Sequence, residues 1–440
     1  MSLRALVAAG FTLLVSLPAQ ATNIERIVSP GGIEAWVVRD STVPLVTVDF
    51  SFNGGSSQDP ADRPGVANIM VSMLDEGAGE LDAKAFHERL EDKAIEFGMR
   101  AGRDTLRGNL RTLAENKDEA FELLRLALNA PRFDAEPLER IRAQVISGLR
   151  RETTSPNEIA SRRWWEAAYP EHPYSRSVNG TPESVAAITT DDLRAFSKRI
   201  LARDQVKIGI VGDIDIPTVH KLLDTVFGTL PVKANLRGVP NVPPKGAGKR
   251  IVAQLDVPQS VVIFGGAGIA RKDPDFMAAY VTNHILGGGS FSSRLYREVR
   301  DLRGLAYSVY SSLSWMHNSA IFIGSTATRA DRTLQAIELI EAEIKRMANE
   351  GPTEKELAEA KSYLSSSFAL GLDTSGKIAG QLVQMQLDDL GIDYIDRRAK
   401  LIDAVTIVDA KRAAKRVFGQ GLLVTVVGRP DAVAGIGPAN

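Results

Sequence analysis

The chain of 440 residues contains no cysteine, which excludes a disulfide framework, a thiolate metal site and a cysteine nucleophile. Its formal net charge of -1 gives no support to binding of nucleic acid or of an anionic membrane. Histidine is also scarce, and no two histidines stand three or four residues apart, the spacing with which a helix presents two zinc ligands. The five are His87, His172, His220, His284 and His317.

Long apolar runs are absent, apart from a short one near the N-terminus. Arg4 precedes an apolar run over residues 5–17, which is too short to span a bilayer, and Ala19 and Ala21 fit a small-x-small cleavage site. This pattern predicts a signal peptide over residues 1–21, with an uncleaved anchor as the alternative. We expect an exported protein without a later membrane span, periplasmic if the cell is a Gram-negative bacterium.

The sequence repeats itself once. A strand-like run opens with Val-Pro and closes with Asp-Pro in each half, at a shift of 214 residues (257 − 43 and 273 − 59). A second strand in each half ends in a glycine, at a shift of 216 residues (428 − 212). The matched positions are Val43 and Val257, Asp59 and Asp273, and Gly212 and Gly428. A nearly constant shift predicts two homologous tandem domains.

The domain boundary falls at residues 231–250, which hold four prolines and three glycines and therefore indicate a linker. The N-terminal domain would span residues 22–230 and the C-terminal domain residues 251–440. Helical periodicity with short, β-branched strands between the helices predicts an α+β sandwich in each half rather than a doubly wound parallel sheet. The clearest helical patterns cover residues 83–97, 117–129, 136–152 and 332–349.

The most informative segment is residues 287–310. Gly287, Gly288 and Gly289 can adopt backbone angles closed to other residues, so we expect a loop here. Ser290 is a good N-cap, which predicts a helix that starts near Phe291. One apolar stripe would then bury a single face of this helix. Its members are Phe291, Leu295, Val299 and Leu302.

Gly304 should end that helix, and a strand should begin at Ala306. Arg300 and Tyr307 would then lie on either side of one tight turn. A guanidinium and a phenol hydroxyl at such a corner could hold a carbonyl or carboxylate of a peptide. The alternative is an arginine in a surface ion pair and a tyrosine packed in the core.

The repeat, the proline-bearing linker, Gly65-x-Ala67, His172-Pro173-Tyr174, Gly180 and the segment SSRLYREVRDLRGLAYSV at 292–309 together resemble the pitrilysin/insulinase family of zinc peptidases. That family includes the mitochondrial processing peptidase and its non-catalytic relatives. The resemblance implies two tandem α/β-sandwich domains that form half of a clamshell. It also implies that Arg300 and Tyr307 hold the substrate backbone near the scissile bond, beside the glycine loop.

Active members of the family carry H-x-x-E-H on the first helix of the N-terminal half, where two histidines bind zinc and the glutamate activates water. In this chain Asn68 and Ser72 stand at the two ligand positions, and Val71 stands at the position of the base. A third ligand would fall near residues 147–149, where Glu152 is the only acid close by. Because amide and hydroxyl oxygens are poor zinc ligands, we predict no catalytic residue and no family zinc site here.

The resemblance therefore implies a non-catalytic, substrate-binding subunit of an exported heterodimeric zinc peptidase. A homologous partner would supply zinc and the general base, and this chain would supply Arg300, Tyr307 and the glycine loop. A stand-alone peptide-binding or scaffolding protein is the alternative. An independently active peptidase with an unusual metal site is a second one.

Four further features have less specific interpretations. Trp164 and Trp165 are expected in the core or at the domain interface. His284 is expected to be structural. The pair Asp75 and Glu76, beside two glycines, is interpreted as a solvated helix end.

The fourth feature is the segment 97–110, which corresponds to the family's substrate-pairing edge strand. Its arginines Arg100, Arg103 and Arg107 would either receive an acidic peptide or discourage aggregation at the edge.

Overall fold

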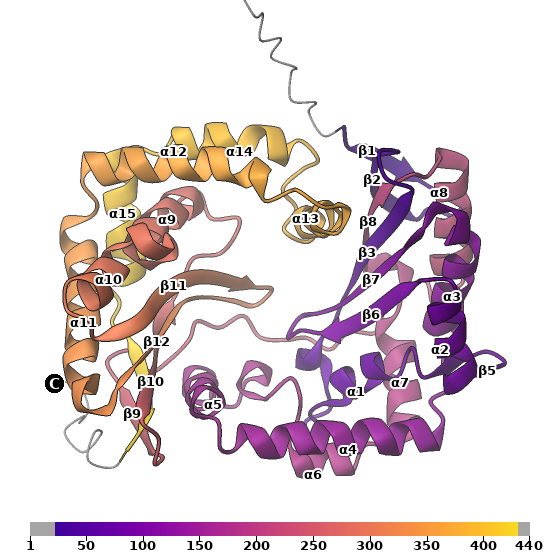
Figure 1. The fold of residues 1–440 in the computed structure, drawn as a ribbon, viewed down its shortest axis with the longest axis horizontal. Helices are drawn as coiled ribbons and strands as arrows, with labels where there is room; N and C mark the ends of the chain where they lie inside the picture. Colours follow the sequence, from indigo (N-terminus) through magenta and orange to yellow (C-terminus); the bar gives the residue numbers. More distant parts are fainter. Residues whose placement is uncertain (1–22, 430–440) are drawn as a thin grey trace, which may run out of the picture.

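The computed structural model describes residues 23–429, so the predicted signal peptide lies outside the described residues. The molecule consists of two halves, each a β-sheet covered by helices, and the two sheets face each other across the molecule (Figure 1). The α+β fold predicted from the sequence is confirmed. Across residues 23–429, no helix combines the length and the apolar character that a membrane crossing requires.

The N-terminal half has a six-stranded sheet in the order β1-β2-β8-β3-β7-β6. Its strands are β1 (Glu25–Val28), β2 (Glu34–Arg39), β3 (Leu45–Asn53), β6 (Glu96–Ala101), β7 (Thr105–Leu113) and β8 (Val206–Gly212), with β4 (Gly77–Ala78) and β5 (Leu81–Asp82) in a separate small hairpin. Its helices are α1 (Val66–Ser72), α2 (Ala83–Asp92), α3 (Lys117–Asn129), α4 (Ala135–Glu152), α5 (Pro156–Ala168), α6 (Pro182–Ala186), α7 (Thr190–Ile200) and α8 (Ile216–Leu222).

The C-terminal half has a five-stranded sheet in the order β11-β12-β10-β13-β9. Its strands are β9 (Arg250–Gln254), β10 (Gln259–Ala267), β11 (Ala306–Met316), β12 (Ser319–Arg329) and β13 (Leu423–Gly428). Its helices are α9 (Phe276–Asn283), α10 (Arg294–Tyr296), α11 (Thr333–Glu350), α12 (Glu354–Leu370), α13 (Ser375–Leu387), α14 (Tyr394–Asp403) and α15 (Ile407–Phe418).

The two sheets have the same topology. The N-terminal order β6-β7-β3-β8-β2 corresponds strand by strand to β11-β12-β10-β13-β9, with β1 added at one edge. Equivalent strands keep nearly one shift, 259 − 45 = 214 for β3 and β10 and 423 − 206 = 217 for β8 and β13. The repeat inferred from the sequence is therefore a repeat of the whole fold.

Three of the four predicted helices match the structure within one residue at each end, and the fourth was predicted too long. Helix α2 stops at Asp92, whereas the apolar pattern extended to residue 97. Ala94 adopts a positive φ of 48°, which ends the helix, and the chain then enters β6 at Glu96. Phe97 belongs to β6, and the sequence pattern had wrongly counted it as part of the helix.

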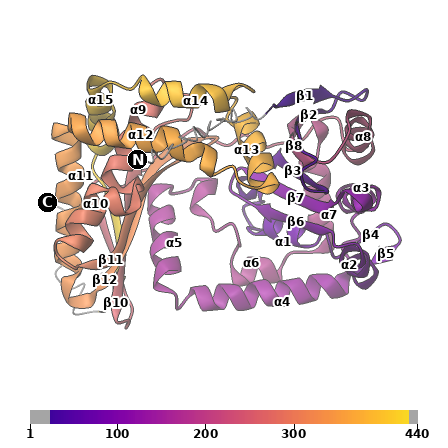
Figure 2. The ribbon, with the colours of Figure 1, turned by 45° about the horizontal axis from the view of Figure 1, so that its top comes forward.

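Each half contributes one helix to the sheet of the other half (Figures 1 and 2). Helix α5 of the N-terminal half packs on β10 and β13, where Trp164 is fully buried and its indole N–H donates to the Leu423 carbonyl at 3.1 Å. Helix α13 of the C-terminal half packs on β3 and β8, burying Ala379 and Leu382. The expected role of Trp164 at a domain interface is confirmed.

Equivalent hairpins of the two repeats also meet at their tips. The turn between β6 and β7 carries Asp104, whose carboxylate accepts hydrogen bonds from the Tyr174 hydroxyl at 2.7 Å and from the His317 N–H at 2.9 Å. His317 lies in the turn between β11 and β12, and the next N–H, that of Asn318, donates to the Tyr174 hydroxyl at 3.1 Å. One carboxylate and one phenol thus join both hairpins.

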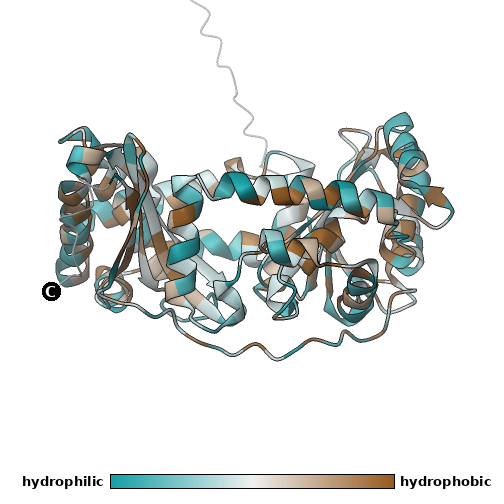
Figure 3. Cartoon of the chain, turned by 90° about the horizontal axis from the view of Figure 1, so that it is seen from below, coloured by the Kyte–Doolittle hydropathy of each residue, from teal (hydrophilic) through white to brown (hydrophobic). Residues whose placement is uncertain are grey.

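The linker contains no helix or strand between residues 231 and 249, and Figure 3 shows it as an extended segment that joins the halves outside the sheets. Its contacts are with both halves. The side chain of Gln58 accepts from the Arg237 N–H at 2.7 Å, and the Val242 N–H donates to the Asn318 carbonyl at 3.0 Å. The linker is therefore attached along its length rather than free.

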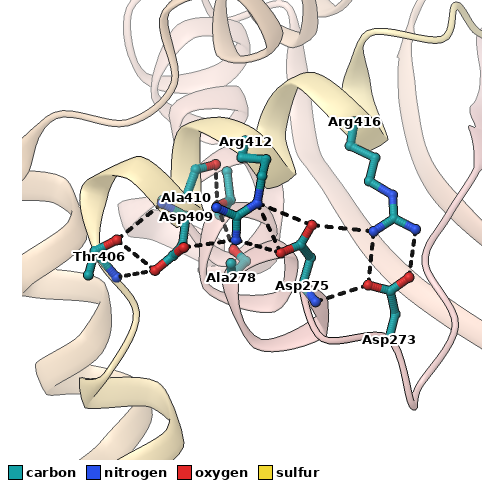
Figure 4. Close-up of polar contacts among 9 residues, drawn as sticks. Asp273, Asp275, Ala278, Thr406, Asp409, Ala410, Arg412 and Arg416 are labelled. Atoms are coloured by element: carbon teal, nitrogen blue, oxygen red, sulfur yellow. Dashed lines mark hydrogen bonds and ion pairs between the residues drawn. The ribbon is translucent and has the colours of Figure 1, made fainter.

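In the C-terminal half, an ion-pair network joins the start of α9 to α15 (Figure 4). Arg416 donates two hydrogen bonds to Asp273, at 2.9 and 2.6 Å, and Arg412 donates to Asp275 at 2.7 Å. These contacts lower the pKa of both carboxyl groups. Because both arginines are about half exposed, the network fixes geometry more than it adds stability.

The hairpin junction predicts a specific loss of stability. Tyr174→Phe removes the hydroxyl, so Asp104 loses one donor and the Asn318 N–H loses its acceptor. We expect a lower urea-unfolding midpoint, corresponding to about 1–3 kcal/mol, because partly buried polar groups are left unpaired. Tyr310→Phe, at an exposed tyrosine, is the matched control and should change stability by less than about 0.5 kcal/mol. Equal effects of the two variants would contradict a joining role for Tyr174.

Candidate functional site

Arg300 and Tyr307 lie on either side of one turn, as the sequence predicted. Gly304, with a φ of 58°, makes the turn between them. The Arg300 guanidinium carbon lies 5.7 Å from the centroid of the Tyr307 ring and 4.8 Å from that of Tyr296. Tyr307 is 85% exposed, so it is not the packed core tyrosine of the alternative interpretation.

The Arg300 side chain keeps donors available beside this exposed phenol. It is 37% exposed, and the one hydrogen bond that the structure gives to it is a long one, from Nη1 to the neighbouring Asp301 at 3.3 Å. An exposed pair of this kind gains little from its own ion pair. A guanidinium and a phenol are thus presented together to whatever approaches this corner.

The helix that carries Arg300 begins later than predicted. Ser293, rather than Ser290, is the N-cap, and its hydroxyl accepts from the Tyr296 N–H at 3.4 Å. Helix α10 therefore starts at Arg294 and continues into a π-helical turn at Arg297–Asp301. Ser290 instead has a φ of 48°. This left-handed conformation is incompatible with a right-handed helix, so the helix begins only after it.

The predicted apolar stripe is only half correct as a consequence. Leu295 and Val299 are buried, whereas Phe291 is 73% and Leu302 63% exposed. Phe291 precedes the helix and packs edge-on against Tyr296, with ring centroids 5.0 Å apart. An exposed aromatic ring therefore stands next to the tyrosine that stacks with Arg300.

The glycines before this helix have a different backbone conformation from the predicted loop. Gly287 and Gly288 belong to a π-helical turn, His284–Gly288, that extends α9, and Gly289 ends it. None of the three has a positive φ, so none adopts the backbone conformation that only glycine reaches easily. A Cβ on Gly287 would collide with the hydroxyl of Ser311, which shows that close packing on β11 requires this glycine.

Helix α1 carries the positions that correspond to the zinc motif, and its side chains do not fit a zinc ion. Val71 is buried in the core, and the Ser72 hydroxyl donates to the Asn68 carbonyl of its own helix at 2.9 Å. Glu152, the acid near the expected third ligand, accepts from the Asn179 side chain at 3.2 Å. Amide, hydroxyl and alkyl groups supply neither a strong ligand set nor a proton acceptor.

The N-terminus of α1 is anchored by a buried carboxyl. Asp59 accepts hydrogen bonds from the N–H groups of Gly65 at 2.7 Å and of Ala67 at 2.9 Å. Burial raises the pKa of Asp59 to about 7, and these two N–H groups and the nearby Arg176 act in the opposite direction. The helix is thus held in place without any group of the zinc motif.

A cavity of about 420 Å³ lies between the end of α4, helix α5 and the segment before α6. Its wall combines acidic, basic and aromatic side chains, among them Glu152, Arg176 and Trp165. Pro64, just before α1, also lines it. The cavity therefore opens beside α1.

The edge position of β6 is confirmed, but two of the three arginines do not face solvent there. Arg103 lies 3.5 Å from the Trp165 ring centroid and donates to the Tyr174 carbonyl at 3.2 Å, and burial lowers its pKa to about 10. Arg107 donates to the Asp49 carboxylate and, at 2.6 Å, to a carbonyl of α13. Only Arg100 is exposed, so two of the three arginines of the predicted basic edge are used in contacts within the chain, one of which joins the two halves.

Asp75 and Glu76 are not the solvated helix end that the sequence indicated. Glu76 is only 4% exposed and pairs with Arg140 of α4. His87 of α2 lies beside them, and the sequence gave no signal for it because it is eleven residues from Glu76. His284 agrees with its structural interpretation, since it stacks on Tyr363 at 5.1 Å and burial lowers its pKa.

Comparison with known proteins gives two family matches. Residues 36–182 match the model of the insulinase family, peptidase family M16, and residues 187–364 match that of the peptidase M16 inactive domain. A Helicobacter pylori protein named non-peptidase homolog YmxG is 28% identical over 334 residues, 76% of this chain and 77% of that protein. A Mycobacterium leprae protein named an uncharacterized zinc protease is 24% identical over 417 residues, 93% of each.

A solved structure is also similar. The crystal structure of a peptidase M16 inactive domain from Pseudomonas fluorescens superposes with a TM-score of 0.86 and 29% identity, covering 92% of this chain and 98% of that one. Two tandem M16 domains therefore define the class of fold. The chain belongs to the M16 insulinase family, whose members similar to it include proteins named as zinc proteases and one named as a non-peptidase homolog.

The buried Asp59 carboxyl predicts a pH dependence of stability. Between pH 3.8 and about 7 the native state keeps the proton that an unfolded Asp59 would release. The free energy of unfolding should therefore fall as pH rises through this window, by up to about 1.4 kcal/mol per pH unit. In Asp59→Asn, the contribution of Asp59 to the slope of the unfolding free energy against pH should be absent. Asp62→Asn, at an exposed carboxylate, should keep the wild-type slope. Chemical unfolding at several pH values measures the slopes, and identical slopes would contradict the prediction.

Proposed function

We propose that this chain is the non-catalytic, substrate-binding subunit of an exported heterodimeric zinc peptidase. A homologous partner with an intact H-x-x-E-H helix would supply the zinc and the general base. This chain would supply Arg300 and Tyr307, which hold the peptide backbone near the bond to be cleaved. The observation that carries the proposal is the exposed Arg300–Tyr307 pair in a chain whose α1 has no zinc ligands.

The chemistry of α1 supports a non-catalytic role. Peptide hydrolysis in this family needs a metal to polarise the carbonyl and a carboxylate to accept a proton from water. Val71 is buried and cannot accept a proton, and Asn68 and Ser72 offer neutral oxygens to a metal that prefers imidazole, thiolate and carboxylate. The similarity to a protein named as a non-peptidase homolog points in the same direction.

The geometry of the C-terminal half supports substrate binding. Arg300 has hydrogen-bond donors facing solvent, and the exposed ring of Tyr307, on the edge strand β11, lies 5.7 Å from its guanidinium carbon. Donors of this type can orient a peptide carbonyl and stabilise the negative charge that develops on it during attack by water. In the proposed complex, attack takes place at the partner's zinc while the backbone is held from this chain.

Two alternatives make different predictions. A stand-alone peptide-binding or scaffolding protein would use the same exposed pair without any peptidase partner. An independently active peptidase would need a metal centre that performs catalysis in the lone chain. Activity of the chain alone and in mixture separates all three.

The first experiment measures peptide cleavage by the mature chain, alone and mixed with a family member that carries H-x-x-E-H and is encoded beside it. We expect no cleavage by the chain alone and chelator-sensitive cleavage after mixing, because the two parts of the site come from different chains. Cleavage by the lone chain that a chelator abolishes would contradict the proposal. Inactivity in both settings would favour the binding or scaffolding alternative.

The second experiment tests the clamp in the assembled complex. Arg300→Ala combined with Tyr307→Phe should lower kcat/KM by about 10²-fold or more, since oriented donors at a developing oxyanion contribute on that scale. Arg297→Ala is the matched control, because Arg297 is an exposed arginine on the same helix and pairs with Glu298 instead. Size-exclusion chromatography should show unchanged assembly. Unchanged turnover in the double variant would remove the clamp from the proposal.

A further inference from the structure

Three potential metal ligands gather on the N-terminal half, away from the positions of the zinc motif. The ligand atoms of Asp75, Glu76 and His87 all lie within 4.8 Å of one another, and His87 Nε2 is 4.0 Å from Asp75 Oδ2. Of the residues in the described range 23–429, these alone form a group of three such side chains. None of them occupies a position that corresponds to a zinc ligand of the family.

Local structure brings the three together. Helix α1 ends at Ser72, and the chain turns through Asp75 and Glu76 into the small hairpin of β4 and β5. The hairpin returns the chain antiparallel, and Asp82 caps α2 by accepting from the Ala85 N–H at 2.8 Å. His87 then lies one turn into α2, next to the turn that carries the carboxylates. The arrangement follows from the hairpin and not from the spacing of a helical motif.

The three side chains have the burial and the charge that suit a cation. Glu76 is buried, whereas the side chains of Asp75 and His87 are 35% and 42% exposed, so an ion can enter from solvent and both can rotate. The charged groups that act on Asp75 are Glu76, His87 and Arg140. Two carboxylates thus face one guanidinium and one imidazole at this corner, a set that still leaves carboxylate oxygens for a cation.

The donor set matches a particular class of metal. Imidazole nitrogen with carboxylate oxygens is a common ligand set for Zn²⁺, at about 2.0–2.2 Å from the ion. Tetrahedral ligands at that distance lie about 3.4 Å apart, so His87 Nε2 and Asp75 Oδ2, now 4.0 Å apart, must move closer by about 0.6 Å. Arg140 holds one oxygen of Glu76, Oε2, and Oε1 is not part of that contact.

We propose that Asp75, Glu76 and His87 form a binding site for a divalent transition metal of the zinc type, with water in the remaining positions. The ion would tie the end of α1 to α2 on the outside of the N-terminal sheet. It would stabilise this corner and has no part in the proposed hydrolysis. A metal found in the purified chain would therefore not by itself indicate a peptidase site.

The test uses the full mature chain after removal of metal by a chelator. Isothermal titration with Zn²⁺ should give one equivalent bound, and Co²⁺ should give visible absorption bands of a coordinated ion. His87→Ala and Asp75→Asn should weaken Zn²⁺ binding by more than about 100-fold, since loss of a ligand should exceed the 10–100-fold cost of losing an outer partner. His220→Ala, at a partly buried histidine of α8, is the matched control and should bind like the wild type.

Two further variants make the outcome decisive. Arg140→Gln should tighten Zn²⁺ binding by about tenfold or more, because it removes a positive charge that repels the cation and competes with it for Glu76. Asn68→Ala with Ser72→Ala should leave binding unchanged, which separates this site from the family's ligand positions. Circular dichroism checks that each variant is folded. Absence of Zn²⁺ binding in the wild type, or undiminished binding in folded His87→Ala, would overturn the proposal.

Discussion

The structure depends on the reciprocal packing of its two halves. Each sheet is covered on its inner face by a helix from the other repeat, α5 on the C-terminal sheet and α13 on the N-terminal sheet, and the equivalent hairpins meet through Asp104 and Tyr174. Burying a tryptophan such as Trp164 contributes several kcal/mol. Neither sheet can therefore lose its partner helix without exposing apolar surface, and the two halves hold a fixed arrangement within the chain.

The residues that hold α1 in the fold differ from those at the two positions that correspond to zinc ligands. Helix α1 is held by Asp59 at its N-terminus and by buried residues such as Ile69 and Met70 on its core face. Asn68 and Ser72 are only partly buried, so the ligand positions of the zinc motif are not among the residues that support the helix. Asn68 and Ser72 thus contribute little to holding the helix, and the fold does not depend on a metal site at α1.

The sequence predicted features that rest on local pattern and on repetition. The shift of 214 to 216 residues indicated two homologous domains, and Gly304 placed Arg300 and Tyr307 at one turn. It could not predict features that depend on distant contacts. Gly287 is needed because of its approach to Ser311, and Glu76 is buried because α4, 64 residues later, brings an arginine to it. Contacts between residues far apart in the chain leave no repeating pattern in the sequence around either residue, so a reading of local patterns does not detect them.

A comparison of equivalent positions in the two repeats shows how the halves have specialised. Asp59 and Asp273 occupy the same position, yet Asp59 is buried and caps α1 through two N–H groups, whereas Asp273 forms a two-pronged ion pair with Arg416. The N-terminal repeat thus anchors α1 through a buried carboxyl. The C-terminal repeat anchors α9, whose π-helical extension lies against the strand that presents Tyr307. This support holds an exposed guanidinium and an exposed phenol side by side, at the corner where the proposed function places the peptide backbone.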